Sequence, residues 1–98
     1  MEKGTPHCKL AMVKALVATG KVRSTFSAMR SAAQLGLGMC DMLAIVAALK
    51  PADFHKSMTT YADHTVWQDV YRPSTLVGHI YLKLTVIDDV LIVSFKEL

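Results

Sequence analysis

Cysteine, proline and glycine are scarce in this chain of 98 residues, which contains two, three and five of them respectively. The two cysteines, Cys8 and Cys40, are too few and too scattered for a disulfide framework and suit a reducing compartment. The apolar run at residues 42–49 is far shorter than the ~20 residues that span a bilayer. Lys9 and Lys14 interrupt the first apolar window, so we expect no signal peptide and a cytoplasmic protein.

Metal and phosphate-loop motifs are also missing. His7 stands beside Cys8, but no second cysteine or histidine follows at the spacing of a metal site. The Gly-Leu-Gly segment at residues 36–38 is typical of a turn between two helices, not of a loop that cradles phosphates. We therefore expect the protein to bind neither a metal ion nor a cofactor.

The composition indicates one globular domain covering residues 1–98, because 52% of the residues are hydrophobic and 19% are charged. The net charge is +3 and is unevenly distributed. Residues 1–50 carry seven basic and two acidic side chains (+5), whereas residues 51–98 carry four and six (−2). The basic half either faces the phosphates of a nucleic acid or only keeps the surface soluble, and the sequence leaves both interpretations open.

The first half of the sequence predicts helices with recognisable ends. The pair Thr5-Pro6 suits the start of a first helix, because threonine caps and proline fits the first helical position. Gly20 is expected to end this helix. A second helix is predicted to begin after a cap at Thr25 or Ser27 and to end at Gly36.

A third helix is predicted for residues 39–49, where Asp41 is the one charged residue. We expect it to be buried nearly all round, between the other helices and the sheet, and to stop at Pro51. The short segment 21–23 carries two positive charges and predicts an edge strand or a turn.

The second half alternates apolar and polar residues, which predicts strands with one buried face. The expected strands lie near residues 53–60, 65–72, 78–87 and 90–97. Asp88 and Asp89 suit a two-residue turn, which pairs Ile87 with Val90. The expected fold class is α/β of the α+β type, with three N-terminal helices packed on a mainly antiparallel sheet.

This register sorts the last two strands into two faces. The expected core face comprises Ile80, Leu82, Leu84, Val86, Leu91, Val93 and Phe95. On the other face Tyr81 lies beside Lys96, and Lys83 lies beside Ser94. That face is either an ordinary solvated surface or part of a site that Lys56 and Gln68 join if the parity of their strands allows.

Three segments closely resemble the family of motility quorum-sensing regulator (MqsR) toxins: DFHKSMTTY at 53–61, DHTVWQDVYRP at 63–73 and VLIVSFK at 90–96. Residues 1–3, 5–7 and 35–37 extend the similarity over the chain. That family is similar in fold to RelE-type toxins and comprises small mRNA interferases, each restrained by a zinc-containing, MqsA-like antitoxin. The resemblance implies a type II toxin that cuts single-stranded mRNA at G-C-U-like sites without a metal, inhibits translation and growth, and meets DNA only through the antitoxin.

The resemblance also implies a catalytic site at Lys56, Gln68 and Tyr81, with Lys96 as a further member. In this interpretation the two lysines stabilise phosphate charge or exchange protons, and Tyr81 orients the substrate or donates a proton. Gln68 donates a hydrogen bond to phosphate or base. The two lysines are also expected to act on each other if they lie close together. The candidate RNA-binding residues are Arg72, Lys83, His55 and His7.

A second function stays open, in which the chain is a non-catalytic interaction module that acts only in complex with its antitoxin as a transcriptional co-regulator. The presence of all four site residue types favours the nuclease.

Aromatic residues can also stack on unpaired RNA bases. Trp67 and Tyr71, however, have the strand parity opposite to Gln68 and Arg72, so we expect them to face the core or a partner.

Overall fold

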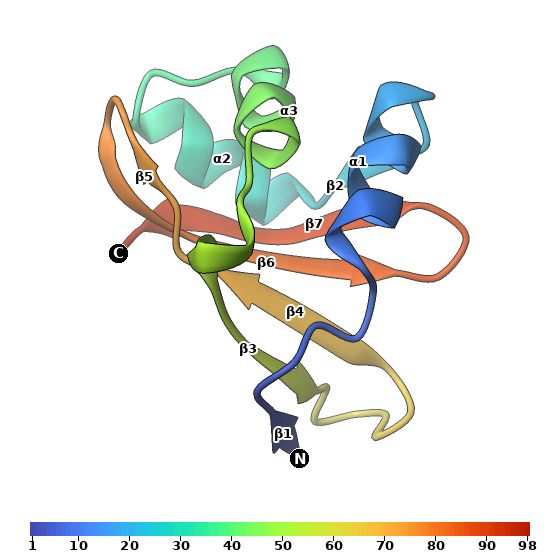
Figure 1. Cartoon of the computed structure of the whole chain (residues 1–98). Helices are drawn as coiled ribbons and strands as arrows, with labels where there is room; N and C mark the ends of the chain where they lie inside the picture. Colours follow the sequence, from blue (N-terminus) through green and yellow to red (C-terminus); the bar gives the residue numbers. More distant parts are fainter.

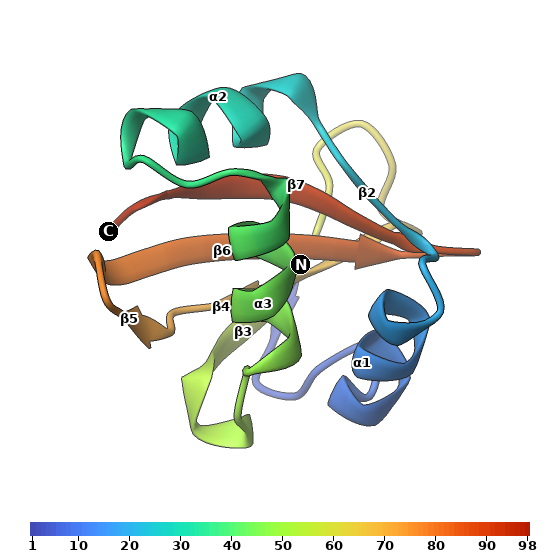
Figure 2. The same cartoon turned by 90° about the horizontal axis from the view of Figure 1, so that it is seen from above.

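The computed structural model describes residues 1–98 and has the predicted α+β fold. The helices are α1 (Leu10–Ala18), α2 (Phe26–Gln34) and α3 (Met39–Ala47), followed by the 3₁₀ helix η1 (Pro51–Asp53). The strands are β1 (Glu2–Lys3), β2 (Val22–Ser24), β3 (Phe54–Thr59), β4 (Trp67–Tyr71), β5 (Ser74–Thr75), β6 (Gly78–Val86) and β7 (Val90–Glu97). Figures 1 and 2 show α1, α2 and α3 on one face of the sheet, here called the helix face. The opposite face carries no helix and is called the open face.

The sheet has the strand order β1-β3-β4-β6-β7-β2, and β5 pairs with the start of β6. Every pairing is antiparallel except that of β2 with β7. The four predicted long strands and the edge strand near residues 21–23 are therefore confirmed. The two-residue strands β1 and β5 were not predicted, because two residues are too short to show a period.

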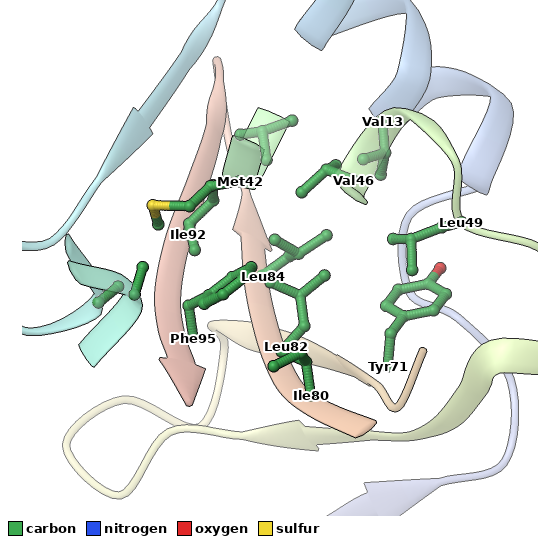
Figure 3. Packing of buried hydrophobic residues seen from close by; sticks show 13 residues of the cluster. Val13, Met42, Val46, Leu49, Tyr71, Ile80, Leu82, Leu84, Ile92 and Phe95 are labelled. Atoms are coloured by element: carbon green, nitrogen blue, oxygen red, sulfur yellow. The ribbon is translucent and has the colours of Figure 1, made fainter. Parts of the chain in front are cut away.

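The core lies between the helices and the helix face (Figure 3). Its largest fully buried side chains include Tyr71, Phe95, Met42, Leu49, Ile80, Leu82, Leu84 and Ile92. Leu82 and Phe95 are direct cross-strand partners on β6 and β7. Each such side chain contributes roughly 1.5–3 kcal/mol when it is removed from water. Because the core lies on this face, the side chains of the open face are not needed for packing and are available for binding.

Helix α1 begins later than predicted, at Leu10 and not near Thr5. The Asp69 carboxylate, 4% exposed, accepts hydrogen bonds from the backbone N–H groups of His7 at 2.9 Å and Cys8 at 3.0 Å. These bonds hold the segment before the helix against β4, so its amide groups are satisfied without a helical turn. Gly20, with φ of 79°, follows the last turn of α1 as expected.

Helix α2 agrees with the prediction. The Thr25 hydroxyl accepts a hydrogen bond from the Ala28 N–H at 3.1 Å, which caps the helix. Gly36 has a φ of 78° directly after the helix, where a residue with a side chain would be strained.

Helix α3 is less buried than predicted. Met42 and Val46 are fully buried, whereas Asp41, Ala44 and Ala47 are exposed. The helix therefore packs through one stripe and does not lie between two layers. Alanine at the outer positions exposes little apolar surface, so a sequence with a single charge still tolerates contact with water. The expectation of burial all round was wrong because it counted apolar residues without their size.

The turn between β6 and β7 is one residue longer than predicted. Val86 pairs with Val90, so Ile87, Asp88 and Asp89 lie between the strands. Asp89 is held by Arg23 of β2, whose Nε lies 2.6 Å from a carboxylate oxygen, and this ion pair lowers the pKa of Asp89. The partner strand β2 therefore takes part in setting the turn, which the hairpin sequence alone does not show.

A bulge in β7 then restores the predicted pairing farther along the hairpin. Leu84 pairs with Ile92, but Lys83 pairs with Ser94, so Val93 is the extra residue. Val90 and Ile92 are buried in the core, and the prediction that Leu91 and Val93 would occupy these places was wrong. Beyond the bulge the error in the turn and the extra residue cancel, and the face assignments are those predicted.

Candidate active site on the open face

The strand register brings the predicted catalytic residues to the open face. Lys56 and Lys83 both pair with Val70, on its two sides, so the three side chains share one face. Gln68 lies two residues from Val70 on β4, and Tyr81 lies two residues from Lys83 on β6, which keeps both on that face. The helices cover the other side of these strands (Figure 1).

Tyr81 is the centre of the densest group of cations on this face. It pairs with Lys96, as the alternation predicted, and the Lys96 Nζ lies 5.2 Å from the centre of its ring. The Lys83 Nζ lies 5.8 Å from the same ring. The Pro73 carbonyl accepts a hydrogen bond from β6 at 3.0 Å, which continues the β4–β6 register and places Arg72 opposite Tyr81. A phenol among three cations can give up a proton where negative charge is stabilised.

Lys56 is paired with an acidic residue that the sequence analysis missed. Its Nζ lies 2.5 Å from Glu2 Oε1, and this hydrogen bond with the Lys56 charge lowers the pKa of Glu2. Glu2 reaches the open face because β1 pairs with β3, with Glu2 opposite Met58. Gln68 is the partner of Met58 on β4, so Glu2, Lys56 and Gln68 form a second group. A strand of two residues gives no signal that would have found Glu2.

The two groups lie apart on the face. Lys56 is on β3 and Lys96 is on β7, which is three strand spacings or about 14 Å at the level of the backbone. Gln68 and Tyr81 are separated along the strands, because Tyr81 stands level with Arg72, four residues from Gln68. The two lysines therefore do not act on each other, contrary to the expectation. The open face therefore carries two separate groups of polar side chains and not a single cluster.

A hollow of about 460 Å³ opens at the end of the sheet, beside the Tyr81 group. Its ionisable lining residues are Asp53, His55, Arg72 and His79. His55 is exposed here because it occupies a bulge in β3, between Phe54 and Lys56, that turns its side chain out of the regular alternation. His55 and Arg72 were RNA-binding candidates, whereas His79 was not.

His7 lies on the other side of the sheet. Its backbone N–H donates to Asp69, and its ring stacks on Trp67 with ring centres 5.5 Å apart. Trp67 and Tyr71 share the helix face, as predicted, and Tyr71 is fully buried there, which raises its pKa to about 12. The sheet thus separates His7 from the other candidates, and we leave it out of the site.

No group of three or more His, Cys, Asp or Glu side chains is placed to hold a metal ion. Cys8 and Cys40 are free, and burial raises the pKa of the Cys8 thiol. None of the helices has the length and apolar character needed to cross a membrane.

Comparisons with known proteins agree on one family. The family model described as "Motility quorum-sensing regulator, toxin of MqsA" matches residues 5–97. The mRNA interferase toxin MqsR of Escherichia coli (strain K12) is 59% identical over 97 residues, which cover 99% of each chain.

Proposed function

The chain belongs to the motility quorum-sensing regulator toxin family, and from this membership we propose that it cuts single-stranded mRNA at short G-C-U-like sites without a metal ion. It is a toxin and an endoribonuclease of the mRNA interferase type. The observation that carries the finer proposal is the Tyr81 group on the open face, where a phenol stands among Lys83, Lys96 and Arg72.

We propose that the RNA strand lies across the open face, from the Lys56–Gln68 group to the Tyr81 group. The separation of the two groups supports a path of several nucleotides. Lysine and arginine side chains along it neutralise successive phosphates. Glu2 keeps the Lys56 ammonium directed over the sheet, and Gln68 donates a hydrogen bond to phosphate or base.

The proposed reaction is attack of a ribose 2′-oxygen on the adjacent phosphorus, with departure of the 5′-oxygen. Water accepts the proton of the 2′-hydroxyl, the Tyr81 hydroxyl gives one to the 5′-oxygen, and the Lys96 ammonium stabilises the negative charge that develops on the phosphate oxygens. Lys83 and Arg72 stabilise the additional negative charge of the phosphorane. The products are a 2′,3′-cyclic phosphate and a 5′-hydroxyl, and Tyr81 then regains a proton from solvent.

Purified chain incubated with single-stranded RNA in excess EDTA tests this proposal. We expect cleavage at full rate and fragments that end in a 2′,3′-cyclic or 3′-phosphate. Tyr81→Phe removes the proposed proton donor and should lower this cleavage strongly. Tyr61→Phe is its matched control and should cleave at the wild-type rate, because Tyr61 is fully exposed in the loop after β3. Fragments with a 3′-hydroxyl, or activity that EDTA abolishes, would refute the proposed chemistry.

The family description names the toxin of MqsA, so the chain has an antitoxin partner. We propose that this antitoxin contains zinc, that both proteins act in the cytoplasm, and that the antitoxin pairs with an edge of the sheet. The outer edges of β1 and β2 present backbone groups to a further strand. Co-expression with the neighbouring small open reading frame should give a stable complex and restore growth. A chain that is expressed alone without slowing growth would contradict the toxin activity.

A further inference from the structure

We infer that the hollow lined by His55, Arg72 and His79 is a binding subsite for the RNA phosphate next to the cleaved one, and that it binds more tightly at lower pH. The inference rests on the proposed cleavage at Tyr81. It adds His79 to the site, and it gives a ligand class to a hollow of about 460 Å³.

The position of the hollow fits a phosphate on the same RNA strand. His79 lies two residues before Tyr81 on β6, so the two side chains share the open face about 7 Å apart along the strand. Arg72 stands opposite Tyr81, and it also lines the hollow. An RNA chain that places one phosphate at Tyr81 and Lys96 therefore brings a neighbouring phosphate to the mouth of the hollow.

The charges of the hollow favour an anion. The Arg72 side chain makes no salt bridge or hydrogen bond with the protein, so its fork of donors is free for a phosphate. Asp53 is the acidic side chain of the lining, and its Oδ2 already accepts the Lys50 N–H at 2.8 Å. A volume of about 460 Å³ lies within the range of small-molecule pockets, roughly 300–1,000 Å³.

The two imidazoles make this affinity depend on pH. Histidine is the side chain that ordinarily gains a positive charge as pH falls from 8 to 5. The other charged side chains near them are Asp53 of η1, Arg72 after β4 and Lys96 of β7. Carboxyl, guanidinium and ammonium groups ordinarily titrate outside this interval. Protonation of His55 and His79 therefore adds positive charge to the hollow, and a bound phosphate favours it.

Binding of an RNA analogue that cannot be cut isolates this subsite from catalysis. The probe is a fluorescein-labelled single strand of eight nucleotides with hydrogen in place of the 2′-hydroxyl at the cut, followed by fluorescence anisotropy. For the wild-type chain we expect an affinity about fivefold higher at pH 6 than at pH 8, the upper range for an exposed charge pair. His55→Gln/His79→Gln should reduce this ratio to about one. Arg72→Gln should lower the slope of log K against log salt by about 0.7 at either pH.

His64→Gln is the matched control, because His64 is an exposed histidine in the loop between β3 and β4, outside the hollow. It should keep the wild-type ratio. In cleavage assays His79→Gln should raise KM and leave kcat unchanged, as expected for binding that does not change in the transition state. A double variant that keeps the pH dependence, or a His79→Gln variant that loses kcat at constant KM, would overturn the subsite.

The two arms separate failure of this inference from failure of the proposed function. A wild-type chain that binds the probe with the expected pH dependence, yet leaves RNA intact, would refute the cleavage proposal and support the subsite. A chain that cuts RNA with the same KM after both histidines are replaced would refute the subsite and leave the cleavage proposal standing.

Discussion

The division of the open face into two groups predicts which pairs of substitutions are coupled. Tyr81→Phe removes one hydroxyl and no core volume, so we expect an intact fold and cleavage lowered by about a hundredfold. This loss corresponds to about 2.7 kcal/mol of transition-state stabilisation. Lys96→Ala, whose Nζ lies 5.2 Å from the Tyr81 ring, should have an effect of similar size.

Double variants distinguish residues that act on the same phosphate from residues that lie far apart on the open face. Independent losses at Tyr81 and Lys96 would multiply to about ten-thousandfold, but groups that act on one phosphate cost less together than their product. We expect the Tyr81→Phe/Lys96→Ala variant to fall short of the product by tenfold or more. Lys56 lies three strands from Lys96, so Lys56→Ala/Lys96→Ala should equal the product of its single losses within about twofold.

The assay is kcat/KM on a short fluorogenic RNA, with thermal unfolding of each variant as the test of folding. Tyr61→Phe and Lys21→Ala, at exposed positions outside the four long strands, should cleave like the wild type. Unfolding of Tyr81→Phe would show that the phenol supports the core. Strong coupling between Lys56 and Lys96 would refute the extended RNA path, because it requires both lysines at one phosphate.

Four further substitutions test contacts around the site and in the core. Glu2→Gln should increase affinity for the uncut RNA analogue a few-fold, because it removes a negative charge beside Lys56, and it should leave Tm unchanged since the ion pair is exposed; weaker binding would show that Glu2 instead orients Lys56 for the phosphate. Asp69→Asn should lower the free energy of unfolding in urea by about 1–3 kcal/mol, because one of the two backbone N–H groups that donate to the carboxylate would then face the amide NH₂, another donor. An unchanged midpoint would mean that other contacts hold the segment before α1. Ile92→Ala should lower the free energy of unfolding by about 2–5 kcal/mol in the same assay, and Leu91→Ala should lower it clearly less, because Ile92 is the buried residue. The reverse order would support the two-residue turn predicted from the sequence.

The parts of the fold that repeat a period could be predicted from the sequence. Strands β3, β4, β6 and β7 alternate over five or more residues, and their alternation assigned Tyr81, Lys83 and Lys96 to one face. The caps of α2 followed from Thr25 and Gly36 in the same way. The burial predicted for α3 was too high, because its outward residues include alanines, which are apolar but expose little surface.

The rest depends on contacts between residues far apart in the sequence. Glu2 meets Lys56 across 54 positions, and Asp69 binds the amides before α1 across more than 60. The hollow collects His55 from a bulge in β3, Arg72 from the segment after β4, and His79 from β6. No local sequence pattern indicates contacts between residues this far apart, so Glu2 and the hollow could not be predicted from the sequence.

The bulge at Val93 also determines where the length of this chain can change. Removal of Val93 would close the bulge and keep the pairs Leu84–Ile92 and Tyr81–Lys96 as they are. Strands β4 and β6 pair without such a shift, so loss of one residue within β4 would turn Gln68 or Tyr71 to the wrong side. Among divergent copies of this protein, single-residue gaps should therefore be found in β7 and in the loops, while β4 keeps a constant length.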